Sequence, residues 1–167
     1  AYQAAKYIAE NSVQGDLVEC GVWRGGISAL IKDVIHDYSD GATVRTHWLF
    51  DTFEGMSEPT EHDFKGGRDV SDTLKKHASL LREDGTSNWC RGDIEDVKQT
   101  MEKENIDSAQ YHLVKGYVES TLKEKVPDKI ALLRLDTDFY ESTKIEMEVL
   151  FERLVVGGIF IVDDYGA

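Results

Sequence analysis

The sequence predicts an α/β fold in which helices cover both faces of a mostly parallel β-sheet. Five short apolar runs of strand length recur along the chain, and each ends in glycine or aspartate. Segments with helical apolar spacing lie between these runs. Strands that alternate with helices are typical of parallel sheets, because each parallel connection needs a crossover. The length of 167 residues suits a single domain.

The five predicted strands have apolar interiors and polar or glycine ends. Strands buried on both faces of a parallel sheet read as continuous apolar runs. Ligands bind beyond the carboxyl ends of such strands, so the residues that close the runs are the candidate functional ones. The runs are 16–21, 47–51, 111–116, 130–136 and 158–163.

Three helices are predicted from apolar spacing and capping residues. The stretch 27–38 carries apolar side chains at i, i+3, i+4, i+7, i+8 and i+11. Asp93 is a predicted N-cap for a helix whose apolar face runs over 94–101. Thr143 and Glu146 form the pattern of a capping box, which predicts that a further helix starts there.

The segment 55–92 fits no strand of the sheet. It is mostly polar and is interrupted by glycines and a proline, with a plausible helix over 71–81. A segment of this length at the ligand end of a sheet is more often a lid or a binding loop than a linker. We therefore expect residues 55–92 to be a lid or substrate loop within one domain that covers 1–167.

Composition and charge exclude several classes of partner. Lys plus Arg number 19 and Asp plus Glu number 32, which gives a net charge of −13. Nucleic acid or an anionic membrane would need a basic face, so neither is expected as a partner. No apolar run approaches the roughly 20 residues of a membrane span, and the start AYQAAKYIAE does not read as a signal peptide. A cytoplasmic location is expected, with Cys20 as a buried thiol.

The first strand leads into a glycine-rich turn, Glu19–Ile27. Glycines at 21, 25 and 26 let the backbone approach a ligand closely. The spacing differs from the dinucleotide-binding GxGxxG pattern, and a plain tight turn remains the alternative.

Asp51 closes the second strand. An acidic residue at this place can accept hydrogen bonds from the two hydroxyls of a ribose. The alternative is that its carboxylate caps the turn by accepting from the N–H groups of Phe53 and Glu54.

Four carboxylates close the last two strands: Asp136, Asp138, Asp163 and Asp164. Ends of adjacent strands lie roughly 5 Å apart, so these groups would crowd one small volume. Such crowding favours a hard cation such as Mg²⁺. The alternative is that Asp138 and Asp164 cap the following segments and point apart. Arg134 either pairs with one of the carboxylates or lies on a solvated part of the sheet.

Four segments together resemble the macrocin O-methyltransferase family. They are GDLVECGVWRGG at 15–26, LFDTFEGM at 49–56, LRLDTDFYEST at 133–143 and GGIFIVDDYG at 157–166. The resemblance implies a Rossmann-like class I methyltransferase that uses S-adenosylmethionine and Mg²⁺ to methylate sugar hydroxyls of natural products. It also implies two further strands after 157–166 and a longer helical segment at the N-terminal end, so the chain is expected to be shorter than the family at both ends.

The resemblance also implies roles for individual residues. Asp138 would be the general base, and Asp136, Asp163 and Asp164 would hold Mg²⁺. Within the cofactor set, Glu19 to Gly26 with Ser28 would hold the methionine end, Asp51 the ribose, and Gly116 to Val118 the adenine. The whole cofactor set is Glu19, Gly21, Val22, Trp23, Arg24, Gly25, Ser28, Asp51, Thr52, Phe53, Gly116, Tyr117 and Val118.

The leading hypothesis is therefore a Mg²⁺-assisted sugar O-methyltransferase that acts on a small glycoside and self-associates. The alternative is a cofactor-binding but inactive domain with an assembly or regulatory role. A phosphatase is disfavoured, because Phe53 stands where that chemistry would want a second aspartate after Asp51.

Overall fold

The structure is a computed structural model that describes residues 1–39, 44–63 and 70–163. Its centre is a sheet of five strands, and every neighbouring pair is parallel. The strand order is β3-β2-β1-β4-β5. The chain thus moves outward on one side of β1 and then returns to the other side. The crevice between β1 and β4, where the direction reverses, is the place where such sheets bind ligands. The strands are β1 (Asp16–Cys20), β2 (His47–Asp51), β3 (Tyr111–Lys115), β4 (Ile130–Leu135) and β5 (Leu154–Val162).

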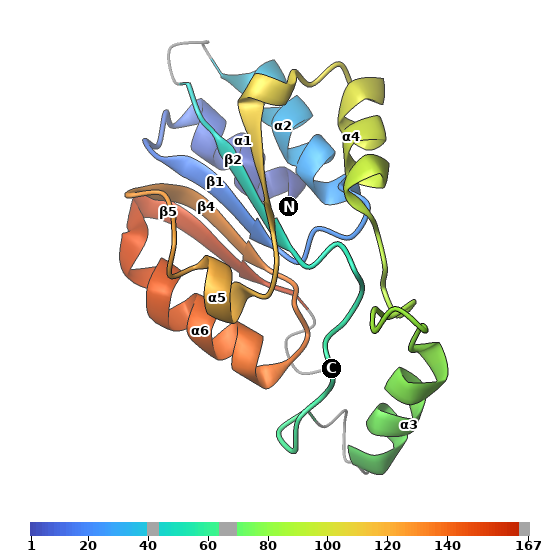
Figure 1. The fold of residues 1–167 in the computed structure, drawn as a ribbon. Coiled ribbons are helices and arrows are strands. Elements are labelled where there is room, and N and C mark those ends of the chain that lie inside the picture. The colour runs from blue at the N-terminus through green and yellow to red at the C-terminus, as the bar shows by residue number, and fades with distance from the viewer. Residues whose placement is uncertain (40–43, 64–69, 164–167) are drawn as a thin grey trace.

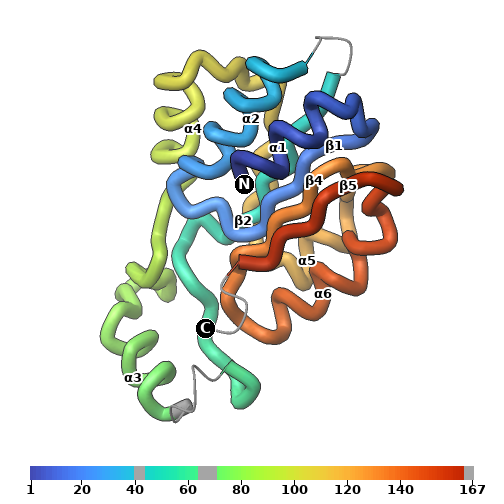
Figure 2. Tube along the Cα trace, turned by 180° about the vertical axis from the view of Figure 1, so that it is seen from behind, coloured from blue at the N-terminus to red at the C-terminus, as the bar shows by residue number. Residues whose placement is uncertain are grey.

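Helices cover both faces of the sheet (Figure 1). One face carries α1 (Tyr2–Glu10), α2 (Gly26–Tyr38) and α4 (Ile94–Lys103). The other carries α5 (Val118–Thr121) and α6 (Tyr140–Leu150). The remaining α-helix, α3 (Val70–Leu80), lies beyond the carboxyl ends of the strands, apart from both layers, in the front and back views (Figures 1 and 2). Two short 3₁₀ turns, Ser108–Gln110 and Phe151–Arg153, precede β3 and β5.

The core divides into buried clusters on the two sides of the sheet. Leu17 and Leu132 pack under α1 and α2, while Val18, Phe50 and Leu133 pack under α5 and α6. Successive strand residues thus point to opposite faces, as the pleat requires. Burial of each such side chain contributes about 1.5–3 kcal/mol. This core holds the strand ends rigidly in place.

The predicted strands are all present, but β5 begins four residues earlier than its glycine-based start. Ile130 pairs with Leu154, whereas Leu132 pairs with Ile159, so β5 bulges between these two points. Gly157 has a φ of 83° within this bulge. The prediction starts the strand after the bulge, at Gly158, because glycines within a strand are unfavourable and therefore suggest its boundary.

The predicted capping box at Thr143 and Glu146 is wrong. The helix begins earlier, at Tyr140, with Phe139 as its N-cap residue. The Thr143 N–H bonds the Phe139 carbonyl inside the helix, at 3.0 Å. The first N–H of the helix is accepted instead by the carboxylate of Asp63. This cap lies far away in the sequence, where a local pattern cannot reveal it.

The other helix predictions are confirmed. The Asp93 side chain accepts from the N–H groups of Glu95 and Asp96, and the Asp96 carboxylate accepts from the Asp93 N–H. The helix expected over 71–81 is α3. None of the helices that the structure describes has the length and apolar character needed to cross a bilayer.

Candidate active site

A cavity of about 290 Å³ lies at the carboxyl ends of the strands. It opens over the crevice between β1 and β4, as the strand order predicts. Gly21 follows β1, Asp51 ends β2, Gly116 follows β3 and Asp136 follows β4, so four neighbouring strands contribute to its wall. Seven residues of the expected cofactor set line this first cavity: Gly21, Trp23, Asp51, Thr52, Gly116, Tyr117 and Val118.

The other six residues of the cofactor set, all in the described part of the chain, are absent from the wall. Val22 and Phe53 point into the apolar core below α4. Arg24 is exposed, with its Nε 3.8 Å from Asp96. Gly25 is the N-cap of α2 with a φ of 77°, and a Cβ there would meet Val97 at 3.1 Å. Val22, Arg24 and Gly25 belong to the loop after β1, and Phe53 belongs to the loop after β2.

Glu19 and Ser28, the last two of the set, are buried between the sheet and α2. Glu19 is 1% exposed, and its Oε2 accepts a short hydrogen bond from the Ser28 hydroxyl. Its Oε1 accepts from Nη1 of Arg134 at 2.6 Å. Burial raises the pKa of Glu19 to about 7, although the bond from Ser28 and the charge of Arg134 lower it. His47 Nε2 lies 3.9 Å from Glu19, but burial lowers the pKa of His47 to about 3, so no ion pair forms between them.

The Asp51 carboxylate joins the loops that follow β1 and β2. Its Oδ2 accepts from the N–H groups of Val22 and Trp23, at 2.7 and 3.0 Å. Its Oδ1 accepts from the Phe53 N–H at 2.7 Å. The Glu54 N–H bonds the Thr52 hydroxyl instead, so the turn-capping alternative is right for Phe53 only. The Thr52 hydroxyl also lies 3.5 Å from Oδ1, but it donates at 2.7 Å to the Gly55 carbonyl. A carboxylate has about four acceptor sites, so Asp51 keeps capacity for about one more strong donor.

The Arg134 guanidinium connects the carboxylates at the strand ends by hydrogen bonds. Its Nη2 donates to Asp136 at 2.7 Å and also, in a very short bond, to Asp163. Of the two alternatives for Arg134, pairing with the carboxylates is therefore the one that the structure shows. Burial raises the pKa of Asp136, the charge of Arg134 lowers it, and the carboxylates of Asp163 and Asp138 raise it again.

The expected metal ligands are placed only in part. Asp136 and Asp163 converge on one nitrogen of Arg134, while Asp164 lies outside the described residues. Within residues 1–39, 44–63 and 70–163, no group of three or more His, Cys, Asp or Glu side chains is arranged to hold a metal ion. The described chain thus offers a pair of converging carboxylates at the strand ends.

Strained backbone gathers around the first cavity. Trp23, Cys90 and Asp138 line it with φ angles of 50°, 49° and 64°. Phe53, with a φ of 55°, lies in the neighbouring loop. Such angles in residues other than glycine cost about 1–3 kcal/mol each and concentrate at functional sites. Ser12 and Asn105 share such angles but do not line the cavity, so four of these six described residues lie at or beside it, which makes the cavity a candidate functional site.

A buried carboxyl group lies directly behind the cavity wall. Glu146 on α6 is fully buried, and its Oε2 accepts from the Thr137 hydroxyl at 3.1 Å. Burial raises the pKa of Glu146 to about 8, and the buried Cys20 thiol also contacts it. The Thr137 bond connects α6 to the loop between Asp136 and Asp138. The apolar spacing of α6 gave no signal for this contact.

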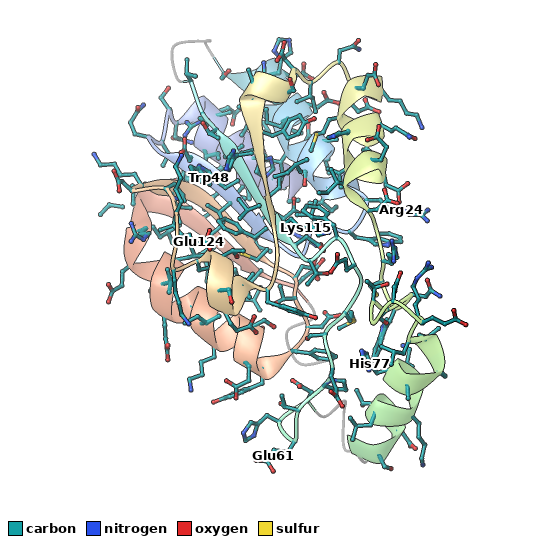
Figure 3. The ribbon with its side chains drawn as sticks, viewed as in Figure 1. Arg24, Trp48, Glu61, His77, Lys115 and Glu124 are labelled. Carbon is teal, nitrogen blue, oxygen red and sulfur yellow. The ribbon has the colours of Figure 1, made fainter. Side chains whose placement is uncertain are left out.

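The two ends of the 55–92 segment are bonded to one another. The Ser87 N–H bonds the Glu54 carbonyl at 2.9 Å, and the Met56 N–H bonds the Trp89 carbonyl at 3.0 Å. Glu54 also pairs with Lys115 at the end of β3, with an Nζ–Oε1 distance of 2.6 Å. The segment is therefore a closed insertion, with Glu61 at its outer loop and His77 on α3 (Figure 3).

A second cavity, of about 340 Å³, lies between this insertion and the start of α6. Its walls contain two aromatic pairs: the rings of Trp89 and Phe139 meet edge-on at 5.9 Å, and those of His62 and Tyr140 lie 4.9 Å apart. Lys76 lies over the Trp89 ring, 4.1 Å from its centroid.

Among the expected site residues that the structure describes, Asp138 alone lines both cavities. It follows β4 by three residues and precedes α6 by two. Sequence reasoning missed several polar members of the walls, because nothing in their spacing sets them apart. They include Ser57, Glu119 and Ser142 in the first cavity and Asp63, Asp72 and Thr73 in the second.

Two curated relatives of this chain are both named O-methyltransferases. The chain is 33% identical over 165 residues to a demethyldecarbamoylnovobiocin O-methyltransferase of Streptomyces niveus, covering 98% of this chain and 57% of the relative. It is 34% identical over 158 residues to an 8-demethyl-8-(2,3-dimethoxy-alpha-L-rhamnosyl)-tetracenomycin-C 4'-O-methyltransferase of Streptomyces olivaceus, covering 95% and 56%. The chain thus spans little more than half the length of these curated relatives.

Solved structures and a family model agree with these relatives. The structure of the O-methyltransferase NovP matches with a TM-score of 0.74 and 31% identity, covering 98% of this chain and 62% of that one. The calicheamicin methyltransferase CalS11 shares the fold, with a TM-score of 0.62 at 22% identity, over 96% of this chain and 61% of that one. The model of the family Macrocin-O-methyltransferase (TylF) matches residues 2–167. The resemblance seen in the four sequence segments is confirmed, and this chain belongs to the macrocin-O-methyltransferase family.

Proposed function

We propose that this chain transfers a methyl group from S-adenosylmethionine to a hydroxyl of a sugar or glycosylated natural product, with the assistance of Mg²⁺. The observation that carries the proposal is the position of Asp138 in the walls of both cavities. One cavity would hold the cofactor and the other the acceptor, so that a reacting hydroxyl would lie beside a carboxylate. The family relationship supports the same reaction class.

The first cavity suits a nucleoside-containing cofactor. Its apolar surfaces, among them Phe50, Tyr117 and Val118, would contact an adenine, and Asp51 would accept a bond from a ribose hydroxyl. Because three of its acceptor sites are already in use, Asp51 would take about one hydroxyl at full strength. Bound S-adenosylmethionine supplies an electrophilic methyl group on a sulfonium centre.

The paired carboxylates suit Mg²⁺, which is typically held by one or two carboxylates and keeps positions for water and substrate. Asp136 and Asp163 would hold the ion, and Asp164 is the third residue that the family resemblance implies. Such an ion lowers the pKa of a bound hydroxyl and fixes its orientation. Arg134 would neutralise the carboxylates in part and keep their orientation.

The second cavity suits a sugar acceptor, because a ligand site of this kind combines ring surfaces with a few polar groups. Trp89 and Tyr140 offer the ring surfaces, and Asp72 and Thr73 add polar groups. Asp138 would accept the proton of the reacting hydroxyl if the hydroxyl lies within hydrogen-bond reach. The rest of the rate enhancement would come from holding the two reactants in line, which can supply about 7–11 kcal/mol.

The proposal is tested by incubating the chain with S-adenosylmethionine, Mg²⁺ and a panel of simple rhamnosides, and detecting the methylated sugar by mass spectrometry. A product that gains one methyl group, and that is lost with a chelator, would support the proposal. A chain that binds S-adenosylhomocysteine but methylates no sugar under any condition would favour the inactive alternative.

A further inference from the structure

Asp63 is a buried carboxylate that links the 55–92 segment to α6. It is 8% exposed and accepts three hydrogen bonds from neutral donors. Its Oδ2 takes the N–H and the hydroxyl of Thr60, at 2.6 and 2.9 Å. Its Oδ1 takes the N–H of Tyr140, at 2.6 Å, across a sequence separation of 77 residues.

The Tyr140 N–H is the first of α6, a helix of 11 residues. The first N–H groups of a helix have no partner inside it, and a negative charge at that end is favourable. The cap residue Phe139 supplies no side-chain bond. Asp63 therefore supplies, from the inserted segment, the hydrogen-bond acceptor that the start of a helix usually obtains from an adjacent Ser, Thr or Asp.

Two ring contacts reinforce this link. His62, next to Asp63, packs on Tyr140, and Trp89, near the far end of the segment, packs on Phe139. The residues touched, Phe139 and Tyr140, directly follow Asp138. All of these residues, Asp63 included, line the second cavity.

We propose that Asp63 is a positioning residue that fixes the segment 138–140 in the wall of the second cavity. The Asp138 carboxylate then keeps a fixed position relative to an acceptor bound there. This inference rests on the proposed function, because it takes Asp138 as the proton acceptor and the second cavity as the acceptor site. Asp63 acts through Tyr140 and does not itself touch the reacting atoms.

The chain offers a matched control for this role. Asp84, in the same inserted segment, accepts the N–H and hydroxyl of Thr86 at 3.0 and 2.6 Å, much as Asp63 does with Thr60. Its bonds stay within its own turn, where it also meets Arg82. Asp84→Ala therefore removes a similar local motif without the bond to α6.

The experiment compares Asp63→Ala, Asp63→Asn and Asp84→Ala with the unmodified chain. The first readout is amide hydrogen exchange at 138–140 by NMR, with the Asp96 amide at the locally capped start of α4 as an internal control. We expect Asp63→Ala to speed exchange of the Tyr140 amide about tenfold, the loss typical of a removed cap. Asp84→Ala should leave it unchanged.

The second readout separates positioning from stability. We expect Asp63→Ala to lower kcat/KM for the rhamnoside acceptor about a hundredfold, since small misplacements at a reacting centre are costly. Affinity for S-adenosylhomocysteine should change by less than about threefold, because Asp63 is outside the first cavity. Asp63→Asn keeps an acceptor oxygen for the Tyr140 N–H and should recover part of the loss, and it serves as the test variant if Asp63→Ala does not fold.

Three results would overturn the inference. One is unchanged exchange at 138–140 in the Asp63 variants. Another is faster exchange with an unchanged kcat/KM, which would make Asp63 a helix cap and nothing more. The third is a loss of S-adenosylhomocysteine affinity as large as the loss of kcat/KM. If the unmodified chain methylates no sugar, the proposed function fails, and the exchange measurement alone decides whether Asp63 fixes 138–140.

Discussion

Glu19 and Arg134 face one another at the same level of adjacent strands β1 and β4, and their side chains form a buried ion pair with an Nη1–Oε1 distance of 2.6 Å. The same guanidinium holds Asp136 and Asp163 at the strand ends. The pair therefore connects the interior of the sheet to the candidate metal ligands. Its side chains lie on the α2 face, where Ser28 completes the bonding of Glu19.

Replacement of Arg134 is expected to be strongly destabilising. Arg134→Met leaves the buried Glu19 without its cation, and removal of one partner of a buried pair costs about 3–5 kcal/mol. The Lys115–Glu54 pair has the same 2.6 Å separation but is half exposed, so Lys115→Met should cost less than about 1 kcal/mol. Urea unfolding of both variants measures the difference. Equal losses would show that burial of the Arg134 pair is not what sets its contribution.

Glu146 is expected to make stability fall as pH rises. Its pKa is raised from 4.5 to about 8, so between these values the native state keeps a proton that the unfolded state has released. The free energy of unfolding then falls by about 1.4 kcal/mol per pH unit for this group, and the loss is complete above about pH 8. Glu146→Gln removes the titration.

Urea unfolding from pH 5.5 to 8.5 tests this expectation. The Glu146→Gln curve should be flatter than that of the unmodified chain, while Glu148→Gln, an exposed site on the same helix, should leave the slope unchanged. Parallel curves for Glu146→Gln and the unmodified chain would mean that Glu146 is already ionised in the folded state.

Gly21 is expected to tolerate no side chain. Its φ is 82°, and a Cβ there would lie 2.1 Å from the Asp136 carbonyl oxygen, where the loops after β1 and β4 cross. Gly21→Ala should lower the free energy of unfolding by more than about 2 kcal/mol and weaken S-adenosylhomocysteine binding. Gly26→Ala is the control, since a Cβ at Gly26 meets nothing within 4 Å. Thermal unfolding of both variants decides, and equal midpoints would contradict the close approach.

The aspartates at the strand ends are expected to have separable roles. Asp163→Asn should weaken Mg²⁺ binding and methyl transfer together, because it removes a charged oxygen ligand. Asp138→Asn should leave Mg²⁺ and S-adenosylhomocysteine binding intact and slow turnover by about 10²–10⁴-fold. Calorimetry and turnover assays on both variants separate the two effects. Turnover of Asp138→Asn at the unmodified rate would exclude it as the base.

The strands were predictable because each is a short apolar run with a polar or glycine end. That pattern also predicted that Asp51, Asp136 and Asp163 would lie at one edge of the sheet, and the structure places them there. The pattern says less about which way a side chain points. Glu19 and Ser28 belong to a motif at the cavity, yet both turn into the layer between β1 and α2.

The contacts that build the second cavity could not be predicted from local spacing. Asp63 caps a helix that starts 77 residues later, and the false capping box at Thr143 shows how a local pattern fails when the true partner is distant. The ring pairs of Trp89 with Phe139 and His62 with Tyr140 depend in the same way on how the inserted segment folds back. Tertiary packing, rather than sequence pattern, determines this part of the site.

The central claim is that the first cavity is a working cofactor site, and calorimetric titration of S-adenosylhomocysteine into the folded chain tests it most directly. We expect one molecule to bind per chain with a dissociation constant in the micromolar range, about −8 kcal/mol, with Mg²⁺ present and also with a chelator, because the wall at Asp51 and Tyr117 needs no metal. Asp51→Asn should weaken binding. A chain that unfolds cooperatively yet gives no heat of binding under either condition would contradict the claim.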